Sequence, residues 1–459
     1  MVTFLSFATL GLLTLYGGLI VYGGLLLRRS GAWRAGGVGL ILLTLLTGSA
    51  QIALSTFSPG IGEPFIRVRL TELIFNSLMN LIAVGGTGTV LVFALRRLDN
   101  WLLGRQRRLP AAFGLLTLLP VAAGLLMYGM VVAGTPPRER ERDPGQRLIG
   151  VPEGFGWSVY ASSSTWDNPT VIAFGPDGRL YVGDIDGSLW VVEQAGGADS
   201  TIRKLLDGFP LLLGLAWRDD ELFVASQGKI EALRDSDGDG RFERRRIVVE
   251  GLPSMILRPH SNNSITFGPD GRLYFGVGST SDNEIEQSPL AAAILSVNPD
   301  GSDLQVFARG FGNPIAVAFN SEGELFGGDN SRTEEPDEFN HIVAGDHYGF
   351  PYYVGDPPSG NTTAPLTTFA RHSVPTGITF YSGDTLPNEY YDNAFLALWA
   401  RGEIQRIEVA RTTTGRYLSR VSTFADGFLY PIGVITGPDG ALYVADFGTS
   451  AIYRIAYIG

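Results

Sequence analysis

The sequence predicts a chain of two parts, an N-terminal all-α transmembrane bundle of four helices followed by an all-β six-bladed β-propeller. Three observations lead to this prediction. Four long apolar runs lie within the first 134 residues, a charged proline-rich segment follows them, and one strand–turn–strand phrase then recurs up to the last residue. We therefore expect a transmembrane domain over residues 1–134, a linker over 135–147 and a propeller over 148–459.

Each of the four apolar runs is long enough to cross a bilayer. A hydrocarbon core of about 30 Å needs roughly 20 helical residues. The runs contain no Lys, Arg, Asp or Glu, and four of them in series favour a permanent anchor over a cleaved signal peptide. Their few polar residues fit hydrogen bonds between helices. The runs are Phe4–Leu27, Gly37–Phe57, Leu73–Leu95 and Ala111–Ala133.

The arginines between the runs set the expected orientation. The first loop holds Arg28, Arg29 and Arg34, and the third holds five more arginines between Arg96 and Arg108. The second loop has two arginines offset by Glu63. Because positive loops stay in the cytoplasm, both termini are expected outside it. This predicts a multi-pass cell-membrane protein whose propeller lies on the extracytoplasmic side, periplasmic or extracellular.

Charge differs between the two parts of the chain. Residues 1–134 hold ten arginines and three acidic residues, which leaves 25 basic and 43 acidic residues in the rest. An acidic domain repels nucleic acid, so no nucleic-acid partner is expected. The chain has no cysteine, which excludes disulfides, thiolate catalysis and Cys-ligated metal sites.

A repeated phrase predicts the propeller. It reads FGPDGRLYV at Phe174–Val182 and FGPDGRLYF at Phe267–Phe275, and its third full copy is Thr436–Val444. An apolar strand, a Pro-Asp-Gly turn and an alternating strand describe a β-hairpin. Weaker copies bring the number to six at a spacing of roughly 40–60 residues, which is typical of propeller blades. The weaker copies are Trp217–Val224, Phe319–Phe326 and Thr376–Leu398.

Six segments, taken together and in order, resemble the glucose/sorbosone dehydrogenase family, the soluble sugar dehydrogenases that depend on pyrroloquinoline quinone (PQQ). The resemblance covers the propeller and none of the membrane part. The segments are HSNN at His260–Asn263, ARGFGNPIAVAF at Ala308–Phe319, DEFNHI at Asp337–Ile342, GDHYGFP at Gly345–Pro351, HSVPTGITF at His372–Phe380, and Gly433–Ile455.

The resemblance implies a PQQ in the central channel, a calcium ion beneath it, and a histidine that takes the sugar hydroxyl proton. His260 matches that catalytic base, and a loop histidine with a pKa near 6.5 suits general-base chemistry. The implied cofactor contacts are Asn262, Asn263, Asn313 and Pro314. His347 and His372 lie in matching loops and are candidates for substrate contact.

Several positions depart from the family's pattern. Gly312, Tyr430 and Ile432 stand where the family places arginines on the PQQ carboxylates, and Ser279 stands where an aspartate is usual. Arginine suits a planar tricarboxylate because its bonds are bidentate and charge-assisted. Arg401 is the candidate replacement for cofactor binding, beside Arg309 and Arg332.

Two acidic segments are candidate calcium sites. Asp235, Asp237 and Asp239 alternate with small residues as in a calcium loop, although Arg246 stands where an EF-hand has its last glutamate. A solvated acidic hairpin tip is the alternative. A second acidic patch, Asp329-Asn330 with Asp337-Glu338, falls where the family builds its cofactor-side calcium site, with Asp329 and Asp337 as the predicted ligands, and hard oxygen ligands suit calcium.

These observations predict a membrane-anchored extracytoplasmic oxidoreductase that oxidises a small sugar-like substrate by hydride transfer to PQQ. Electrons would pass to a membrane quinone or another electron carrier. Two alternatives remain open. The propeller could bind a glycan or another ligand without redox chemistry, which the missing arginines favour, or it could be a calcium-dependent lactonase without PQQ.

Overall fold

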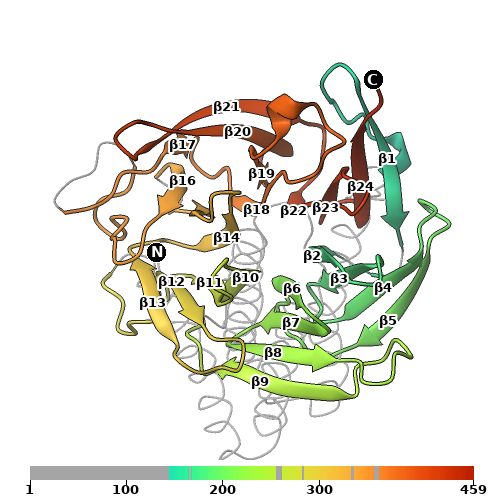
Figure 1. Ribbon diagram of the computed structural model, residues 1–459, viewed down its shortest axis with the longest axis horizontal. Helices are drawn as coiled ribbons and strands as arrows, with labels where there is room; N and C mark the ends of the chain where they lie inside the picture. Colours follow the sequence, from blue (N-terminus) through green and yellow to red (C-terminus); the bar gives the residue numbers. More distant parts are fainter. Residues whose placement is uncertain are drawn as a thin grey trace, which may run out of the picture. The chain divides into compact units, whose positions relative to one another are not determined.

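Twenty-four strands form six four-stranded antiparallel sheets in the part of the chain that the structure describes, and the sheets are arranged radially as the blades of a propeller (Figure 1). The computed structural model describes residues 144–459, apart from residues 164, 167, 255–260, 282–283, 332–334 and 356–360. The predicted six-bladed propeller is confirmed.

The four predicted membrane runs lie outside the described residues. Residues 135–143 of the predicted linker lie outside them as well. The bundle therefore stays a prediction. Among residues 144–459, in the ranges given above, no helix has the length and apolar character needed to cross a membrane. The short helices of this part are η2 (Pro144–Gln146) and η3 (Asn388–Tyr390).

Blades 1 to 5 are each built from four strands that follow one another in the chain. Blade 1 contains β2 (Pro169–Phe174), β3 (Leu180–Asp184), β4 (Leu189–Gln194) and β5 (Thr201–Leu206). Blade 2 contains β6 (Gly214–Arg218), β7 (Glu221–Ser226), β8 (Lys229–Arg234) and β9 (Arg244–Glu250). Blade 3 contains β10 (Asn262–Phe267), β11 (Leu273–Val277), β12 (Ala293–Val297) and β13 (Gln305–Arg309).

Blades 4 and 5 continue this order, and blade 6 differs because it closes the ring. Blade 4 contains β14 (Pro314–Phe319), β15 (Leu325–Asp329), β16 (Asp337–Ile342) and β17 (Thr367–Phe369). Blade 5 contains β18 (Pro375–Phe380), β19 (Ala394–Leu398), β20 (Glu403–Arg411) and β21 (Tyr417–Ala425). Blade 6 joins β22 (Pro431–Thr436), β23 (Leu442–Asp446) and β24 (Ala451–Tyr457) to the N-terminal strand β1 (Phe155–Ser162).

The first strand of each blade, or β22 in blade 6, is the inner strand, and neighbouring inner strands contact one another around the ring. We call the face where the inner strands begin the upper face and the face where they end the lower face. The β1–β24 pairing runs from Phe155 opposite Tyr457 to Ser162 opposite Ala451, so the two ends of the propeller domain meet in one sheet.

The core lies between blades and is rich in aromatic pairs. In five blades the last residue of the inner strand, or the residue before it in blade 2, is aromatic, and its ring lies 4.9–5.1 Å from an aromatic ring on the second strand of the preceding blade. The pairs are Phe174–Tyr443, Trp217–Tyr181, Phe267–Phe223, Phe319–Tyr274 and Phe380–Phe326. Blade 6 has Thr436 at this position.

The repeated Pro-Asp-Gly turn is held by its aspartate. In blade 3, Asp270 accepts the backbone N–H of Arg272 at 3.1 Å and the hydroxyl of Tyr274 at 2.9 Å. Burial and the hydrogen bond to Asp270 raise the pKa of Tyr274 to about 12. Asp177 and Asp439 make the same pair of contacts in blades 1 and 6. The repeated sequence phrase therefore corresponds to a repeated pair of hydrogen bonds to the aspartate of the turn.

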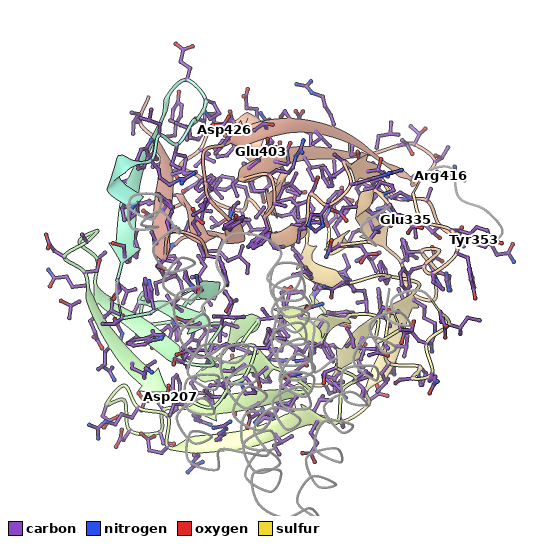
Figure 2. The ribbon with its side chains drawn as sticks, turned by 180° about the vertical axis from the view of Figure 1, so that it is seen from behind. Asp207, Glu335, Tyr353, Glu403, Arg416 and Asp426 are labelled. Carbon is purple, nitrogen blue, oxygen red and sulfur yellow. The ribbon has the colours of Figure 1, made fainter. Side chains whose placement is uncertain are left out.

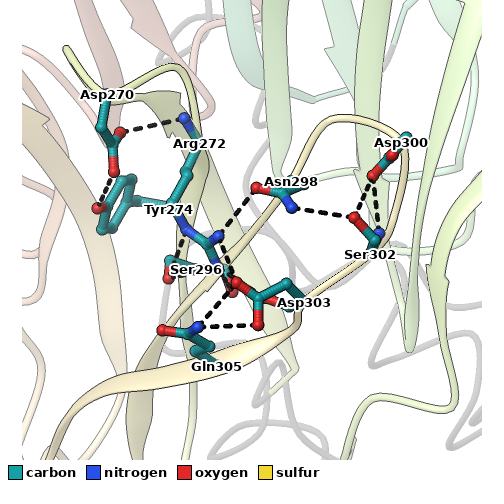
Figure 3. Close-up of polar contacts among 9 residues, drawn as sticks. All are labelled: Asp270, Arg272, Tyr274, Ser296, Asn298, Asp300, Ser302, Asp303 and Gln305. Atoms are coloured by element: carbon teal, nitrogen blue, oxygen red, sulfur yellow. Dashed lines mark hydrogen bonds and ion pairs between the residues drawn. The ribbon is translucent and has the colours of Figure 1, made fainter.

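Arg272 ties the first hairpin of blade 3 to the second (Figure 3). Its guanidinium donates to the side chains of Asn298 and Asp303, both at 2.9 Å, and to backbone oxygens of Ser296 and Asp303. The side chain is 17% exposed, so most of these bonds are shielded from water.

Replacing Arg272 with Met is expected to lower the free energy of unfolding by roughly 2–3 kcal/mol, because partly buried acceptors lose a charged donor. Chemical denaturation of the purified protein measures the change. Arg420→Met is the matched control, because its side chain is 79% exposed with one ion pair at 3.4 Å, and its effect should stay below about 0.5 kcal/mol. Equal effects of the two changes would contradict the assigned role.

The chain enters the propeller beside the end of β21. Gly150 pairs with Asp426, and Arg147 donates to the backbone oxygen of Gly427 at 2.8 Å. Figure 2 shows Asp426 beside Glu403, at the end of β21 and the start of β20. The described N-terminal segment is therefore attached to the upper ends of the outer strands of blade 5.

Candidate functional site

The upper face collects the segments that the family resemblance singled out. Ser261 precedes the inner strand of blade 3, Asn313 that of blade 4, Val374 that of blade 5, and Tyr430 that of blade 6. Arg401 follows the second strand of blade 5, which ends on the same face, and Asp337 begins the third strand of blade 4 there. The fold thus brings these positions, far apart in sequence, to one end of the propeller axis.

Buried aspartates fix the upper ends of four inner strands. Each of these strands begins with proline, and the N–H of the residue before the proline is accepted by an aspartate. The donors and acceptors are Asn168 to Asp184, Asn313 to Asp329, Val374 to Asp337 and Tyr430 to Asp446. These four carboxylates are 0–2% exposed, and their first role is to set the positions of the upper-face segments.

Asp329 and Asp337, the predicted metal ligands, are both buried in blade 4. Asp329 accepts the N–H groups of Gly312 and Asn313, each at 2.8 Å. Asp337 accepts those of Ser331 at 2.9 Å and Val374 at 2.8 Å. Burial raises the pKa of Asp337 to about 6, and burial together with the charge of Glu338 raises the pKa of Asp329 well above its usual range.

Glu338, which the sequence placed beside Asp337 in the same acidic segment, adds a third buried carboxylate. It lies opposite Asp329 in the β15–β16 register and accepts the N–H of Gly355 at 2.7 Å. Burial raises the pKa of Glu338 to about 7. Three carboxylates in a dry environment oppose one another's ionisation, so protons or a cation must compensate them.

Two further oxygens belong to this acidic cluster of Asp329, Asp337 and Glu338. The side-chain oxygens of Ser331 and Asn340 are buried and have no hydrogen-bond partner among the described residues. Asn340 donates its amide to Glu338 at 3.2 Å, so it lies beside the cluster. Carboxylates with uncompensated neutral oxygens suit a hard cation. The types of residue present in the acidic cluster therefore fit calcium. The three carboxylates of this cluster do not all lie within 4.8 Å of one another in the described structure.

His260, the predicted base, lies outside the described residues, whereas the predicted cofactor contacts Asn262, Asn263 and Asn313 are described. Asn262 accepts the N–H of Gly228 at 2.8 Å and donates to the backbone of Lys229 at 3.0 Å. Asn263 donates to Asn313 and to the backbone oxygen of Pro314, both at 3.0 Å. Asn262, Asn263 and Asn313 are at most 2% exposed, so they join blades 2, 3 and 4 beneath the face.

Gly312 is packed against backbone, which explains the missing arginine at this position. A Cβ here would lie 3.0 Å from the carbonyl oxygen of Asn330 and 3.2 Å from Cα of Ser331. The Gly312 carbonyl also accepts the N–H of Ser279 at 2.7 Å. A larger side chain would have to displace the segment after β15.

The carboxylate missing at Ser279 is supplied from further along the same loop. Glu286 accepts hydrogen bonds from Ser279, Thr280 and Ser281. Although burial opposes it, these bonds lower the pKa of Glu286, which is therefore ionised. No motif in the sequence marked Glu286.

An aromatic pair that no sequence motif indicated lies on blades 5 and 6. Trp399 and Tyr430 stack with ring centroids 4.3 Å apart and planes 27° apart, and Phe447 contacts Trp399 edge-on at 6.3 Å. The backbone of Trp399 is bonded to Val374, and that of Tyr430 to Asp446. Arg401 is in the same turn as Trp399 and is exposed. This turn therefore offers a flat apolar surface and one guanidinium.

The two histidines proposed for substrate contact differ. Nδ1 of His347 accepts the N–H of Gly349 at 3.0 Å, which leaves Nε2 to carry the proton in the neutral ring. Partial burial of the ring, and then the charge of Arg309, lower the pKa of His347. His372 is half-buried with φ of 60°, a strained backbone for a residue with a side chain.

The Asp235–Glu243 loop joins β8 to β9 on the lower face, away from the segments above. One oxygen each from Asp235, Asp237, Asp239 and Glu243 lies within 4.8 Å of the others. Asp235 also accepts the N–H groups of Gly238 and Gly240, both at 2.8 Å, so the loop is shaped around its carboxylates. Calcium at this loop stays a prediction.

On the long loops of blade 4, charged and aromatic side chains face solvent. Figure 2 shows Glu335 and Tyr353 on the same side of the propeller, on the loops after β15 and β16. Tyr352 is 63% exposed and Tyr353 48% exposed. The two tyrosines form no part of the acidic cluster, whereas the charge of Glu335 contributes to the raised pKa of Glu338.

Comparisons with known proteins agree with this architecture. The family described as Domain of unknown function (DUF7133) matches residues 145–455. An uncharacterized protein of Borreliella burgdorferi is 25% identical over 354 residues, which cover 67% of this chain and 91% of that protein.

Solved structures of sugar dehydrogenases share the fold. A putative oxidoreductase of Thermus thermophilus, described as a glucose dehydrogenase, is 23% identical with a TM-score of 0.57 and covers 66% of this chain and 99% of its own. The PQQ-bound aldose sugar dehydrogenase of Streptomyces coelicolor is 20% identical with a TM-score of 0.54, covering 67% and 99%. The holo PQQ domain of a Coprinopsis cinerea pyranose dehydrogenase is 16% identical with a TM-score of 0.57, covering 68% and 97%.

Proposed function

Because this chain belongs to the DUF7133 family, whose description names no activity, we propose a function from the upper face: the propeller is an oxidoreductase that oxidises a hydroxyl of a small sugar-like substrate, with PQQ as the hydride acceptor. The observation that carries the proposal is the composition of the face. A stacked aromatic pair with an arginine on blades 5 and 6 shares this face with the acidic cluster on blade 4.

PQQ is a planar aromatic tricarboxylate, so its site needs a flat surface and cations. The Trp399–Tyr430 pair supplies the surface and Arg401 a guanidinium. The residues therefore fit the cofactor, with fewer arginines than the resemblance led us to expect. Asn262, Asn263 and Asn313 would act indirectly, by fixing the segments around it. Bound PQQ would supply a two-electron acceptor for the hydride.

Each side chain then has a defined task in the reaction. His260 takes the proton of the substrate hydroxyl while the carbon that bears this hydroxyl loses a hydride. Trp399 and Tyr430 present a flat apolar face that orients a ring, and Arg401 neutralises a carboxylate. The acidic cluster would hold calcium, which polarises carbonyl oxygens as a Lewis acid. The substrate loses two electrons and two hydrogens and becomes a lactone or carbonyl product.

A direct test is to add PQQ and calcium to the purified full chain and to measure the absorbance of bound quinone after gel filtration. We expect uptake at micromolar PQQ with millimolar calcium. Arg401→Gln should weaken uptake about tenfold, since a charge-assisted bond contributes roughly 1.5–3 kcal/mol. Arg416→Gln, at an exposed position of the β20–β21 turn on the lower face, is the control. Absence of uptake by the wild-type chain would overturn the dehydrogenase proposal.

A second candidate function is ligand binding without PQQ, as in a glycan-binding propeller or a calcium-dependent lactonase. The observation that favours it is the burial of Asn262, Asn263 and Asn313 together with the packing of Gly312, since these remove direct cofactor contacts. Binding of a sugar without quinone uptake would select this function.

We also propose that residues 1–134 anchor the propeller in the membrane and hold it outside the cytoplasm, where its electrons pass to a membrane quinone or another carrier. The support is the arginine distribution between the apolar runs. The division into residues 1–134, 135–147 and 148–459 is part of the same proposal.

We expect Gly459 to lie outside the cytoplasm, because the first and third loops between the apolar runs carry the positive charge. A reporter that is active only outside the cytoplasm should therefore be active when it is fused after Gly459. Alkaline phosphatase activity measures this, and a green fluorescent protein fusion at the same residue should give the opposite result. Protease added to intact spheroplasts should release a propeller fragment. Protection of that fragment would show that the orientation is wrong.

A further inference from the structure

A pocket lies on the lower face, at the end of the axis opposite to the proposed active site. Its volume is about 380 Å³, within the range of small-molecule sites of about 300–1,000 Å³. Its walls come from three consecutive blades: Ser382 and Asp384 follow the inner strand of blade 5, Thr436 ends that of blade 6 and Gly437 follows it, and Phe174 ends that of blade 1.

The pocket lies where the aromatic repeat of the lower face is interrupted. Five inner strands have an aromatic residue at or next to their lower end that packs on the preceding blade, whereas blade 6 has Thr436 there. A threonine side chain is much smaller than a phenylalanine ring, and Thr436 is part of the pocket lining.

The lining is polar on one side and aromatic on the other. The hydroxyl oxygen of Thr436 is buried and has no hydrogen-bond partner among the described residues. Ser382 and Asp384 are exposed, so a hydroxyl and a carboxylate face solvent at the rim. Phe174 is held by Tyr443, whose ring meets it edge-on at 4.9 Å.

The rim is fixed by a buried tyrosine. Tyr381 is 1% exposed, and its hydroxyl donates to the backbone oxygen of Gly440 at 2.9 Å. The hydroxyl oxygen of Tyr381 also accepts the N–H of Leu386 at 2.9 Å and that of Thr385 at 3.2 Å. These bonds join the loop after β18 to the turn after β22, so the pocket is formed before any ligand binds.

We propose that this lower pocket binds a neutral polyhydroxylated ligand of about the size of one pyranose ring. Such a ligand has an apolar C–H face that suits Phe174 and hydroxyl groups that donate to Asp384 and exchange hydrogen bonds with Thr436 and Ser382. An anion is disfavoured by Asp384, and one carboxylate is too few for a divalent cation. The site is separate from the upper face, and binding there requires no cofactor.

The test is the number of binding sites for D-glucose on the full-length protein in detergent, by isothermal titration calorimetry without PQQ. We expect a site that Thr436→Val weakens about five- to tenfold through loss of one hydrogen-bonding group. Thr436→Phe restores the aromatic repeat and should abolish this site. Thr413→Val, at an exposed position in the β20–β21 turn, is the matched control and should leave binding unchanged.

The outcomes separate this inference from the proposed dehydrogenase. Both Thr436 variants should keep their rate of sugar oxidation, while His260→Ala should lose oxidation and retain the Thr436-dependent site. Ser382→Trp, at an exposed rim position, tests the pocket without changing the core and should also block it. Glucose binding unaffected by Thr436→Phe and Ser382→Trp, or no binding at tens of millimolar glucose, would overturn the lower-pocket proposal whether or not the chain oxidises sugars.

Discussion

Replacing His260 with Ala is expected to reduce dye-linked sugar oxidation by about 10²–10⁴-fold while PQQ uptake stays within a few-fold of wild type. The reason is that the change removes the group that accepts the substrate proton and leaves the aromatic pair, Arg401 and the acidic cluster in place. The substrate hydroxyl, whose pKa is far above that of histidine, would then lose its proton to water alone. The measurements are the oxidation rate at saturating sugar and the absorbance of bound quinone.

His341→Gln is the matched control for the histidine change. His341 lies near the lower end of β16, where its Nε2 is 3.1 Å from a carboxylate oxygen of Glu324, so its loss should not touch the reaction. The pH profile adds a second readout. Oxidation by wild type should rise with pH through the pKa of a histidine base, and His260→Ala should lose this rise. A variant that oxidises sugar at the wild-type rate would remove His260 from the mechanism.

The fold could be predicted from sequence because the repeated phrase has a local cause. Each Pro-Asp-Gly turn carries an aspartate that accepts the N–H of the residue two positions later and the hydroxyl of the tyrosine four positions later. About ten consecutive residues therefore determine each hairpin. The closing strand Phe155–Ser162 was not predicted, because its partner Ala451–Tyr457 lies at the other end of the chain. Nothing local identifies such a pairing.

The surroundings of the site residues could not be predicted, because residue type does not reveal burial. The side chains of Asn262, Asn263 and Asn313 have the chemistry of ligand contacts, and in the structure they bond to groups of neighbouring strands and blades. Trp399 was missed because one tryptophan after a strand is ordinary, and only the fold brings Tyr430 against it. Glu338 was placed in the acidic patch by the sequence, but only the β15–β16 register shows that it lies opposite Asp329.

Without calcium, the protein is expected to lose stability as pH rises from about 5 to 8. The pKa of Asp337 is about 6 and that of Glu338 about 7 in the folded protein, both above the values of the unfolded chain. A group with a raised pKa in the folded state binds its proton more tightly there, so its stabilisation is present at low pH and is lost as pH rises through the folded pKa. Asp329 acts in the same direction, because its pKa is also raised.

Between pH 5 and 8 the expected loss is about 1 kcal/mol for Asp337 and about 2–3 kcal/mol for Glu338, at about 1.4 kcal/mol per unit of pKa change, because part of the change for Asp337 falls below pH 5. A loss of this size lowers Tm by several degrees. His347 acts in the opposite direction, because its pKa is lowered, but its exposure to solvent keeps its contribution small. The carboxylates with lowered pKa values, such as Asp177, titrate below the window of this experiment.

If the acidic cluster binds calcium, the ion is expected to abolish this loss of stability with rising pH. The reason is that calcium replaces the protons that the cluster otherwise needs and binds the folded state alone. Thermal unfolding of the full chain in EDTA and in millimolar calcium, at half-unit steps from pH 5 to 8, measures both effects. Asp337→Asn with Glu338→Gln should remove the slope and most of the response to calcium. Asp235→Asn with Asp237→Asn changes only the loop between β8 and β9, so it should keep the slope. A different result would be that calcium raises Tm equally at pH 5 and pH 8 and that only the loop variant loses this response. Calcium would then bind at Asp235–Glu243, and protons alone would compensate the charges of the acidic cluster.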